Sequence, residues 1–263
     1  MRVQGAITLV TGAGSGIGAA LARRFAAEGA EHVVVADRDA GAAARVAEEV
    51  GGTAVTVDVR DPDAVRRMVE ATLEQHGRVD LLCSNAGMAT GAGLDDPAAW
   101  QAAYEVHVMA HVHAAHAVLP SMLARGSGHL LSTASAAGLL TSPGDAPYAV
   151  TKHAAVALAE WLAVTYGGRG IGVSVLCPMG VDTPLLAEPL AAGDQYARVV
   201  AASGAVIGVD AVADAVMDGL GRDAFLILPH PEVATFWAQK AADPERWLSG
   251  MRRLVDAWTA EGT

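Results

Sequence analysis

The feature that most constrains the fold is a glycine-rich segment behind a short apolar run near the N-terminus. Residues 6–11 read AITLVT, which has the length and composition of a buried strand, and residues 12–18 read GAGSGIG. A helical pattern, AALARRFAAEGA, follows. Strand, glycine loop and helix in this order form a cradle for the pyrophosphate of a dinucleotide, because the backbone can approach the phosphates and the helix start binds their charge. The predicted contacts are Gly12, Ser15, Gly16, Ile17 and Gly18.

The same alternation of strand and helix patterns continues along the 263 residues without a polar linker. Further strands are expected at 32–37, 53–57, 80–84, 128–134, 171–177 and 224–229, and helices at 40–51, 62–76, 97–123, 148–166 and 210–220. Such alternation favours parallel strands joined by helical crossovers. We therefore predict an α/β fold, a single doubly wound Rossmann-type domain over 1–263 with a central parallel sheet flanked by helices.

The second predicted strand ends in Asp37, nineteen residues after Gly18. A carboxylate at this position accepts hydrogen bonds from the adenosine ribose hydroxyls and repels a 2′-phosphate, so it selects NAD over NADP. Arg38 beside it could pair with a phosphate and leaves the alternative open. The glycine loop itself contains no basic residue, since Ser15 occupies its centre. NAD is the expected cofactor.

A second group of residues indicates chemistry. Tyr148 and Lys152 are four residues apart, so on a helix they share one face. A lysine ammonium near a phenol favours the phenolate and lowers the tyrosine pKa from about 10, which makes the tyrosine a usable acid or base. Ser135 lies thirteen residues upstream, at the end of an apolar run, where its hydroxyl can donate to a developing alkoxide. The Tyr-x-x-x-Lys spacing alone would more often be a surface pair.

Together with the glycine loop, these motifs resemble the short-chain dehydrogenase/reductase family from about Ile7 to Thr183. The resemblance implies that Ser135, Tyr148 and Lys152 are catalytic and that Tyr148 and Lys152 also contact the nicotinamide ribose. Asp58 and Val59 resemble the pair that contacts adenine, although Asp58 could instead cap the next helix. By the same resemblance the cofactor lies against Asn85, Ala86, Gly87, Pro178, Gly180, Val181 and Thr183.

His107 departs from the family pattern, because relatives usually carry an asparagine there. The resemblance implies that this position helps to hold a water that leads to the catalytic lysine. A histidine can bond a water too, which would add a titration near pH 6.5, or it can simply pack in the core. His111 shares its helix face, but no third ligand is evident, so no metal site is predicted.

Beyond residue 183 the sequence carries less pattern. We expect a substrate lid at about 184–208 and a C-terminal tail at about 230–263 that covers either the substrate cleft or a subunit interface. The expected substrate walls are uncharged, which favours a hydrophobic secondary alcohol or its ketone; they are Met88, Ala137, Leu139, Met179, Leu185 and Leu186. In relatives the two long central helices form dimer and tetramer contacts, so a homo-oligomer is expected.

Charge and composition limit the other function classes. The formal net charge is −11, with 18 basic and 29 acidic residues, which argues against a nucleic-acid partner. No apolar run approaches the roughly 18 to 20 residues of a membrane span, and no signal peptide pattern precedes the first strand. Cys83 and Cys177 end apolar runs and are expected as buried thiols, which suggests a cytoplasmic enzyme. The alternatives are a sugar-nucleotide epimerase or dehydratase and a catalytically silent NAD-sensing protein.

Overall fold

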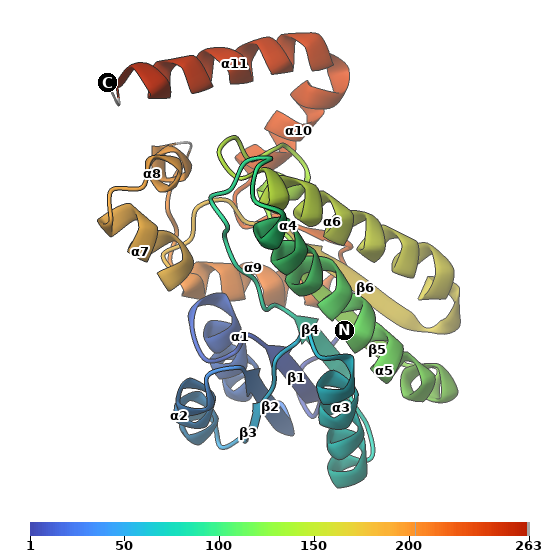
Figure 1. Ribbon diagram of the computed structural model, residues 1–263. Coiled ribbons are helices and arrows are strands. Elements are labelled where there is room, and N and C mark those ends of the chain that lie inside the picture. Colours follow the sequence, from blue (N-terminus) through green and yellow to red (C-terminus); the bar gives the residue numbers. More distant parts are fainter. Residues whose placement is uncertain (203, 262–263) are drawn as a thin grey trace.

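The fold is organised around a parallel sheet of seven strands in the order β3-β2-β1-β4-β5-β6-β7. In this computed structural model residues 1–202 and 204–261 are described (Figure 1). The strands are β1 (Ile7–Thr11), β2 (His32–Asp37), β3 (Thr53–Thr56), β4 (Leu81–Ser84), β5 (Gly128–Thr133), β6 (Ile171–Leu176) and β7 (Leu226–Ile227). The predicted fold class is confirmed.

Helices cover both faces of the sheet, as Figure 1 shows. One layer contains α1 (Gly16–Ala27), α2 (Ala40–Val50) and α9 (Val209–Gly221), and the other contains α3 (Pro62–His76), α5 (Ala110–Arg125) and α6 (Ala146–Tyr166). Because strand side chains alternate between faces, Val33 and Val35 pack under the first layer while Val34 packs under the second. Both faces of β2 are therefore buried, which explains its unbroken apolar run.

The chain runs outward in one direction from β1 to β3 and then crosses back to β4 on the other side of β1. At this reversal the connections after β1 and β4 leave to opposite faces of the sheet and open a crevice at its carboxyl edge. Ligands of doubly wound sheets bind in such a crevice. The predicted glycine loop lies between β1 and α1, directly at this edge.

The helix expected over 97–123 is interrupted. It consists of α4 (Pro97–Tyr104), a π-helical turn (Glu105–Met109) and α5, in one continuous run. A π turn inserts one extra residue per turn and is common at functional sites. It brings His107 into the core, where none of its surface is exposed.

The C-terminal third differs most from expectation. The predicted lid contains two helices, α7 (Pro184–Ala191) and α8 (Gln195–Ala202), and the last strand is shorter than predicted. The tail forms α10 (Glu232–Ala242) and α11 (Pro244–Glu261), and α11 lies above the body of the domain in Figure 1. Short 3-10 turns cover Ala136–Gly138 and Gly167–Arg169. Residue 203 of the predicted lid and residues 262–263 of the tail lie outside the described residues.

Within the described ranges, no helix combines the length and the apolar character that a bilayer crossing requires.

Candidate active site

A cleft of about 890 Å³ runs along the carboxyl edge of the sheet, from the glycine loop to α11. It contains most of the predicted site residues, which come from the loops after six strands, β1 to β6, and from α6. Of the residues predicted to contact the cofactor, those that line the cleft are Gly12, Ser15, Gly16, Ile17, Asp37, Arg38, Asp58, Val59, Asn85, Ala86, Gly87, Pro178, Gly180, Val181 and Thr183. Ser135, Tyr148 and Lys152 line it further along.

The glycine loop fits the phosphates of a dinucleotide. Gly12 has a φ of 63°, and a Cβ on it would lie 2.7 Å from the Ala86 Cα, so no other residue fits. The Ser15 side chain makes no capping hydrogen bond to α1, which leaves the first N–H groups of this helix open to an anion. Gly18 was predicted as a phosphate contact, but its position serves packing. A Cβ added to it would lie 2.2 Å from the Gly12 carbonyl oxygen. It allows α1 to pack closely and does not line the cleft.

Asp37 stands at the end of β2, with both oxygens oriented by backbone donors. Oδ2 accepts from Gly14 N at 2.9 Å and Oδ1 accepts from Asp39 N at 3.0 Å.

Asp58 forms an ion pair with Arg60 at 2.6 Å and lines the same end of the cleft. The helix-cap alternative for Asp58 is wrong, because Asp61 caps α3 by accepting from Asp63 N and Ala64 N. The ion pair with Arg60 lowers the pKa of the Asp58 carboxyl.

A hydrogen-bond chain connects the glycine loop to Lys152. The Asn85 side-chain amide donates to Thr11 O at 3.1 Å and to Gly12 O at 3.3 Å, and its oxygen accepts from Thr133 Oγ1 at 3.1 Å. The Thr133 carbonyl in turn accepts from Lys152 Nζ at 3.0 Å. Asn85 thus fixes the phosphate loop relative to β5 and to the lysine.

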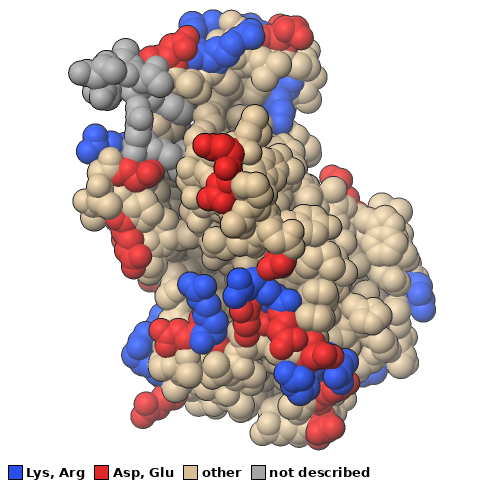
Figure 2. Space-filling view, viewed as in Figure 1, with Lys and Arg blue, Asp and Glu red and all other residues tan. Residues whose placement is uncertain are grey.

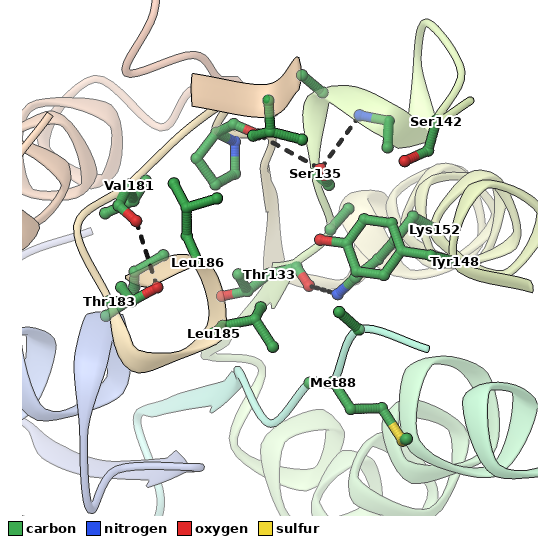
Figure 3. A pocket seen from close by; sticks show the side chains of 18 of the residues that line it. Met88, Thr133, Ser135, Ser142, Tyr148, Lys152, Val181, Thr183, Leu185 and Leu186 are labelled. Atoms are coloured by element: carbon green, nitrogen blue, oxygen red, sulfur yellow. Dashed lines mark hydrogen bonds between the residues drawn. The ribbon is translucent and has the colours of Figure 1, made fainter. Parts of the chain in front are cut away.

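Lys152 is 3% exposed, and its Nζ lies 5.6 Å from the centroid of the Tyr148 ring. Burial lowers the pKa of Lys152 to about 8. Ser135 Oγ accepts from Ala137 N at 3.1 Å and donates to Pro178 O over a long 3.4 Å. Figure 3 shows Ser135, Tyr148 and Lys152 together on one side of the cleft, opposite Val181, Thr183, Leu185 and Leu186.

His107 does not reach the cleft, and protein groups bond both of its ring nitrogens. Nε2 accepts from Met88 N at 3.1 Å, and Nδ1 lies 2.8 Å from Thr151 Oγ1. Because the Thr151 hydroxyl donates to Pro147 O at 2.7 Å, the proton between them belongs to Nδ1. Burial and then Lys152 lower the pKa of His107 to about 2. This geometry favours the packing role over a titrating water relay.

His111, one turn further along, is 3% exposed, and within the described residues neither ring nitrogen has a hydrogen-bond partner. Burial and the nearby Lys152 lower its pKa to about 3. No group of three or more His, Cys, Asp or Glu side chains among the described residues could hold a metal ion.

Asp145 does not line the cleft but positions residues that do, and the motifs did not indicate it. It is completely buried, and it accepts from Tyr148 N at 3.0 Å, from Thr90 N at 2.7 Å, from Gly91 N at 2.9 Å and from the Thr90 hydroxyl. The carboxylate caps α6 and attaches the loop after β4 to the turn that carries Tyr148. An aspartate three residues before the tyrosine, with Pro147 between them, is a capping signal that could have revealed it.

Five of the six predicted substrate walls line the cleft: Met88, Ala137, Met179, Leu185 and Leu186. Leu139 does not; it is 5% exposed and packs in the core, and its neighbour Leu140 faces the cleft instead. The 3-10 turn after Ser135 rotates the chain, so counting along the sequence chose the wrong leucine. Further lining residues were not predicted; they include Val199, Val200, Phe236, Gln239, Trp247, Met251 and Leu254.

Comparison with known proteins agrees with this architecture. A sequence profile described as short chain dehydrogenase matches residues 6–192. The chain is 38% identical over 248 residues to 1-deoxy-11-beta-hydroxypentalenate dehydrogenase of Streptomyces exfoliatus, which covers 88% of this chain and 86% of that protein. It is 36% identical over 200 residues to oxidoreductase UcpA of Escherichia coli, with 72% and 74% covered.

Two solved structures share the fold. A short chain dehydrogenase/reductase from Burkholderia phymatum in complex with NAD superposes with a TM-score of 0.84 at 31% identity, over 93% of this chain and 96% of that one. A short-chain dehydrogenase from Sphingobium yanoikuyae in complex with NADPH gives 0.74 at 28% identity, over 96% and 95%. With the profile match over most of the chain and relatives aligned nearly end to end, this protein belongs to the short-chain dehydrogenase/reductase family.

Proposed function

We propose that the protein is an NAD-dependent oxidoreductase that interconverts a hydrophobic secondary alcohol and its ketone. The observation that carries the proposal is the grouping of Ser135, Tyr148 and Lys152 on one side of a cleft whose other wall is apolar. The name of the Streptomyces exfoliatus relative, a dehydrogenase of a hydroxylated compound, supports an alcohol substrate.

In the oxidation direction, the Tyr148 phenolate takes the proton of the substrate hydroxyl. Ser135 turns its hydroxyl from the long bond to Pro178 O toward the substrate oxygen and stabilises the charge that develops there. Lys152, held by Thr133 O, supports the phenolate through its positive charge and offers its remaining protons to the nicotinamide ribose. When bound, the nicotinamide supplies the hydride chemistry, while these residues position the substrate and move its proton.

The preference for NAD is inferred from Asp37, whose oxygens stand at the cleft wall beside Arg38. A 2′-phosphate there would face a like charge, so we expect kcat/KM with NAD to exceed that with NADP by at least about tenfold. Asp37→Ser should lower this ratio, and Asp39→Ser, two residues further along at the exposed N-cap of α2, should leave it unchanged. Turnover of a panel of secondary alcohols with each cofactor measures both effects. If the wild type has equal kcat/KM with NAD and with NADP, pairing of the 2′-phosphate with Arg38 outweighs its repulsion by Asp37.

We further propose that the protein is a homo-oligomer in the cytoplasm. Large apolar side chains on α6 remain exposed, Trp161 by 57% and Val164 by 87%, and Figure 2 shows few charged side chains on the side formed by α5 and α6. Such a face is suited to a second copy of the chain. The free thiols of Cys83 and Cys177 are buried, as expected in a reducing compartment.

A further inference from the structure

The cleft continues well past the Ser135–Tyr148–Lys152 group, and its far end is built by the C-terminal helices. Trp247, Met251 and Leu254 are spaced over two turns on one face of α11, and all three line the cleft. Phe236 of α10 lies beside them on the same lining. We call these four residues the distal wall.

The distal wall is apolar but not fully covered by the protein. Phe236, Trp247 and Met251 are half-buried, and Leu254 is 39% exposed. Across the cleft, Leu185 of α7 is 45% exposed, and Val200 of α8 is half-buried. Apolar side chains that face one another across an open cleft gain free energy when an apolar ligand removes their surface from water.

Charge is distributed unequally along the cleft. The charged side chains that line it are Asp37, Arg38, Asp58 and Arg60 at the adenosine end and Lys152 at the centre. Among the described residues between Lys152 and the distal wall, the lining carries no charged side chain. An ionised group on a substrate would lose its hydration there without gaining a partner, which is strongly unfavourable.

A side chain of α10 connects the distal wall to the segment that follows Ser135. Lys240 of α10 donates to the carbonyls of Leu139 and Leu140, at 2.8 Å and 2.6 Å. These carbonyls belong to the segment that follows Ser135, so one ammonium group ties the C-terminal helices to the loop that carries the serine. This contact positions α10, and with it Phe236, relative to the segment that follows Ser135.

From these observations we infer that the substrate is a large, uncharged alcohol whose apolar skeleton extends from Tyr148 to the distal wall, and that Trp247 and Met251 determine the preference for size. The inference rests on the proposed function, because it takes the reacting carbinol to lie at Tyr148. To the proposed function it adds the size and the charge of the part of the substrate that lies beyond the carbinol.

The test compares cyclohexanol, decalol and perhydroanthracenol, which have one, two and three fused saturated rings, as substrates with NAD. For the wild type, kcat/KM should rise with ring number. Met251→Ala should lower kcat/KM for the three-ring alcohol about tenfold, through KM, and change it for cyclohexanol by less than about twofold. Leu248→Ala is the matched control, because Leu248 is 50% exposed on α11 and does not line the cleft.

A carboxylate on the ring farthest from the carbinol tests the charge. This carboxylate should abolish most of the increase in kcat/KM that the third ring gives. Met251→Arg should restore turnover of the three-ring acid, because it places a positive charge beside the carboxylate. If wild-type efficiency does not depend on ring number, or if Met251→Ala and Leu248→Ala behave alike, the inference is overturned while the proposed function stands. If none of the alcohols is oxidised, the proposed function itself fails.

Discussion

Tyr148 is the residue on which the proposed chemistry depends most directly. Its ring lies near Lys152 and faces the cleft, so its hydroxyl is placed to exchange a proton with a bound alcohol (Figure 3). Tyr148→Phe removes this hydroxyl and keeps the ring. We expect turnover to fall below a few per cent of the wild-type rate, while NADH binding, followed by fluorescence titration, stays within about threefold. A phenylalanine variant that keeps its rate would show that another group transfers the proton.

His107 is expected to act through structure and not through titration. Its pKa of about 2 keeps the ring neutral at neutral and mildly acidic pH, so His107→Asn should leave the acidic limb of the rate profile unchanged. His107→Leu leaves the Met88 N–H without its acceptor, which should cost about 1 to 3 kcal/mol of unfolding free energy. Rate profiles against pH and urea unfolding of both variants decide this. A lost or displaced acidic limb in the asparagine variant would restore the relay role.

The residue scale also shows why some positions could be predicted and others could not. Gly12 and Asp37 depend on local geometry, a positive φ and a strand end, and both occur where the motif predicts them. Leu139 and Leu140 are adjacent in the sequence, but only Leu140 lines the cleft. The turn after Ser135 determines which of the two side chains does so. The partners of His107 come from residues 88 and 151, and no local pattern indicates that pairing.

At the scale of elements, Asp145 joins α6 to the loop after β4. Its two carboxylate oxygens serve four donors, and a carboxamide has only one acceptor oxygen, so Asp145→Asn must lose about half of these bonds. We expect a loss of about 1 to 3 kcal/mol in unfolding free energy and a lower kcat, because the first turn of α6 carries Tyr148.

Asp96→Asn provides the control for this change, since Asp96 caps α4 through Ala99 N in an exposed position. It should cost at most about 0.5 kcal/mol and leave kcat unaltered. Urea unfolding and steady-state kinetics of both variants are the measurements. Equal effects at the two caps would mean that Asp145 stabilises the helix start and nothing more.

Most elements could be predicted because their periodicity is local, but the π turn, α7 and α8 could not, and β7 is shorter than the predicted strand. The π turn at Glu105–Met109 has the composition of an ordinary helix. Its His107 contacts Thr151 and Tyr148 of α6, which lie far away in the sequence. Helices α7 and α8 are short and contain small apolar residues whose pattern is weak. β7 keeps only two residues in the sheet, since it pairs with β6 alone at the edge.

On the scale of the whole molecule, the buried histidines determine the response to acid. Burial lowers the pKa of His107, His111 and His129 to about 2, 3 and 4. The unfolded chain binds protons at these residues below about pH 6.5, and the folded chain does not until much lower pH. Stability is therefore complete above about pH 6.5 and falls as the pH decreases, by about 2 kcal/mol for each histidine at about pH 5.

His111→Leu isolates one of these contributions, because within the described residues its ring nitrogens have no partner to lose. The variant should be at least as stable as the wild type near pH 7.5, since an unpaired buried polar group is unfavourable. Between about pH 6.5 and 5, the slope of its unfolding free energy against pH should be smaller by roughly one proton. His116→Leu, at an exposed position on the same helix, is the matched control. Urea unfolding at three pH values measures both slopes; equal slopes for the two variants would mean that His111 is protonated in the folded chain and that its burial does not drive the acid response.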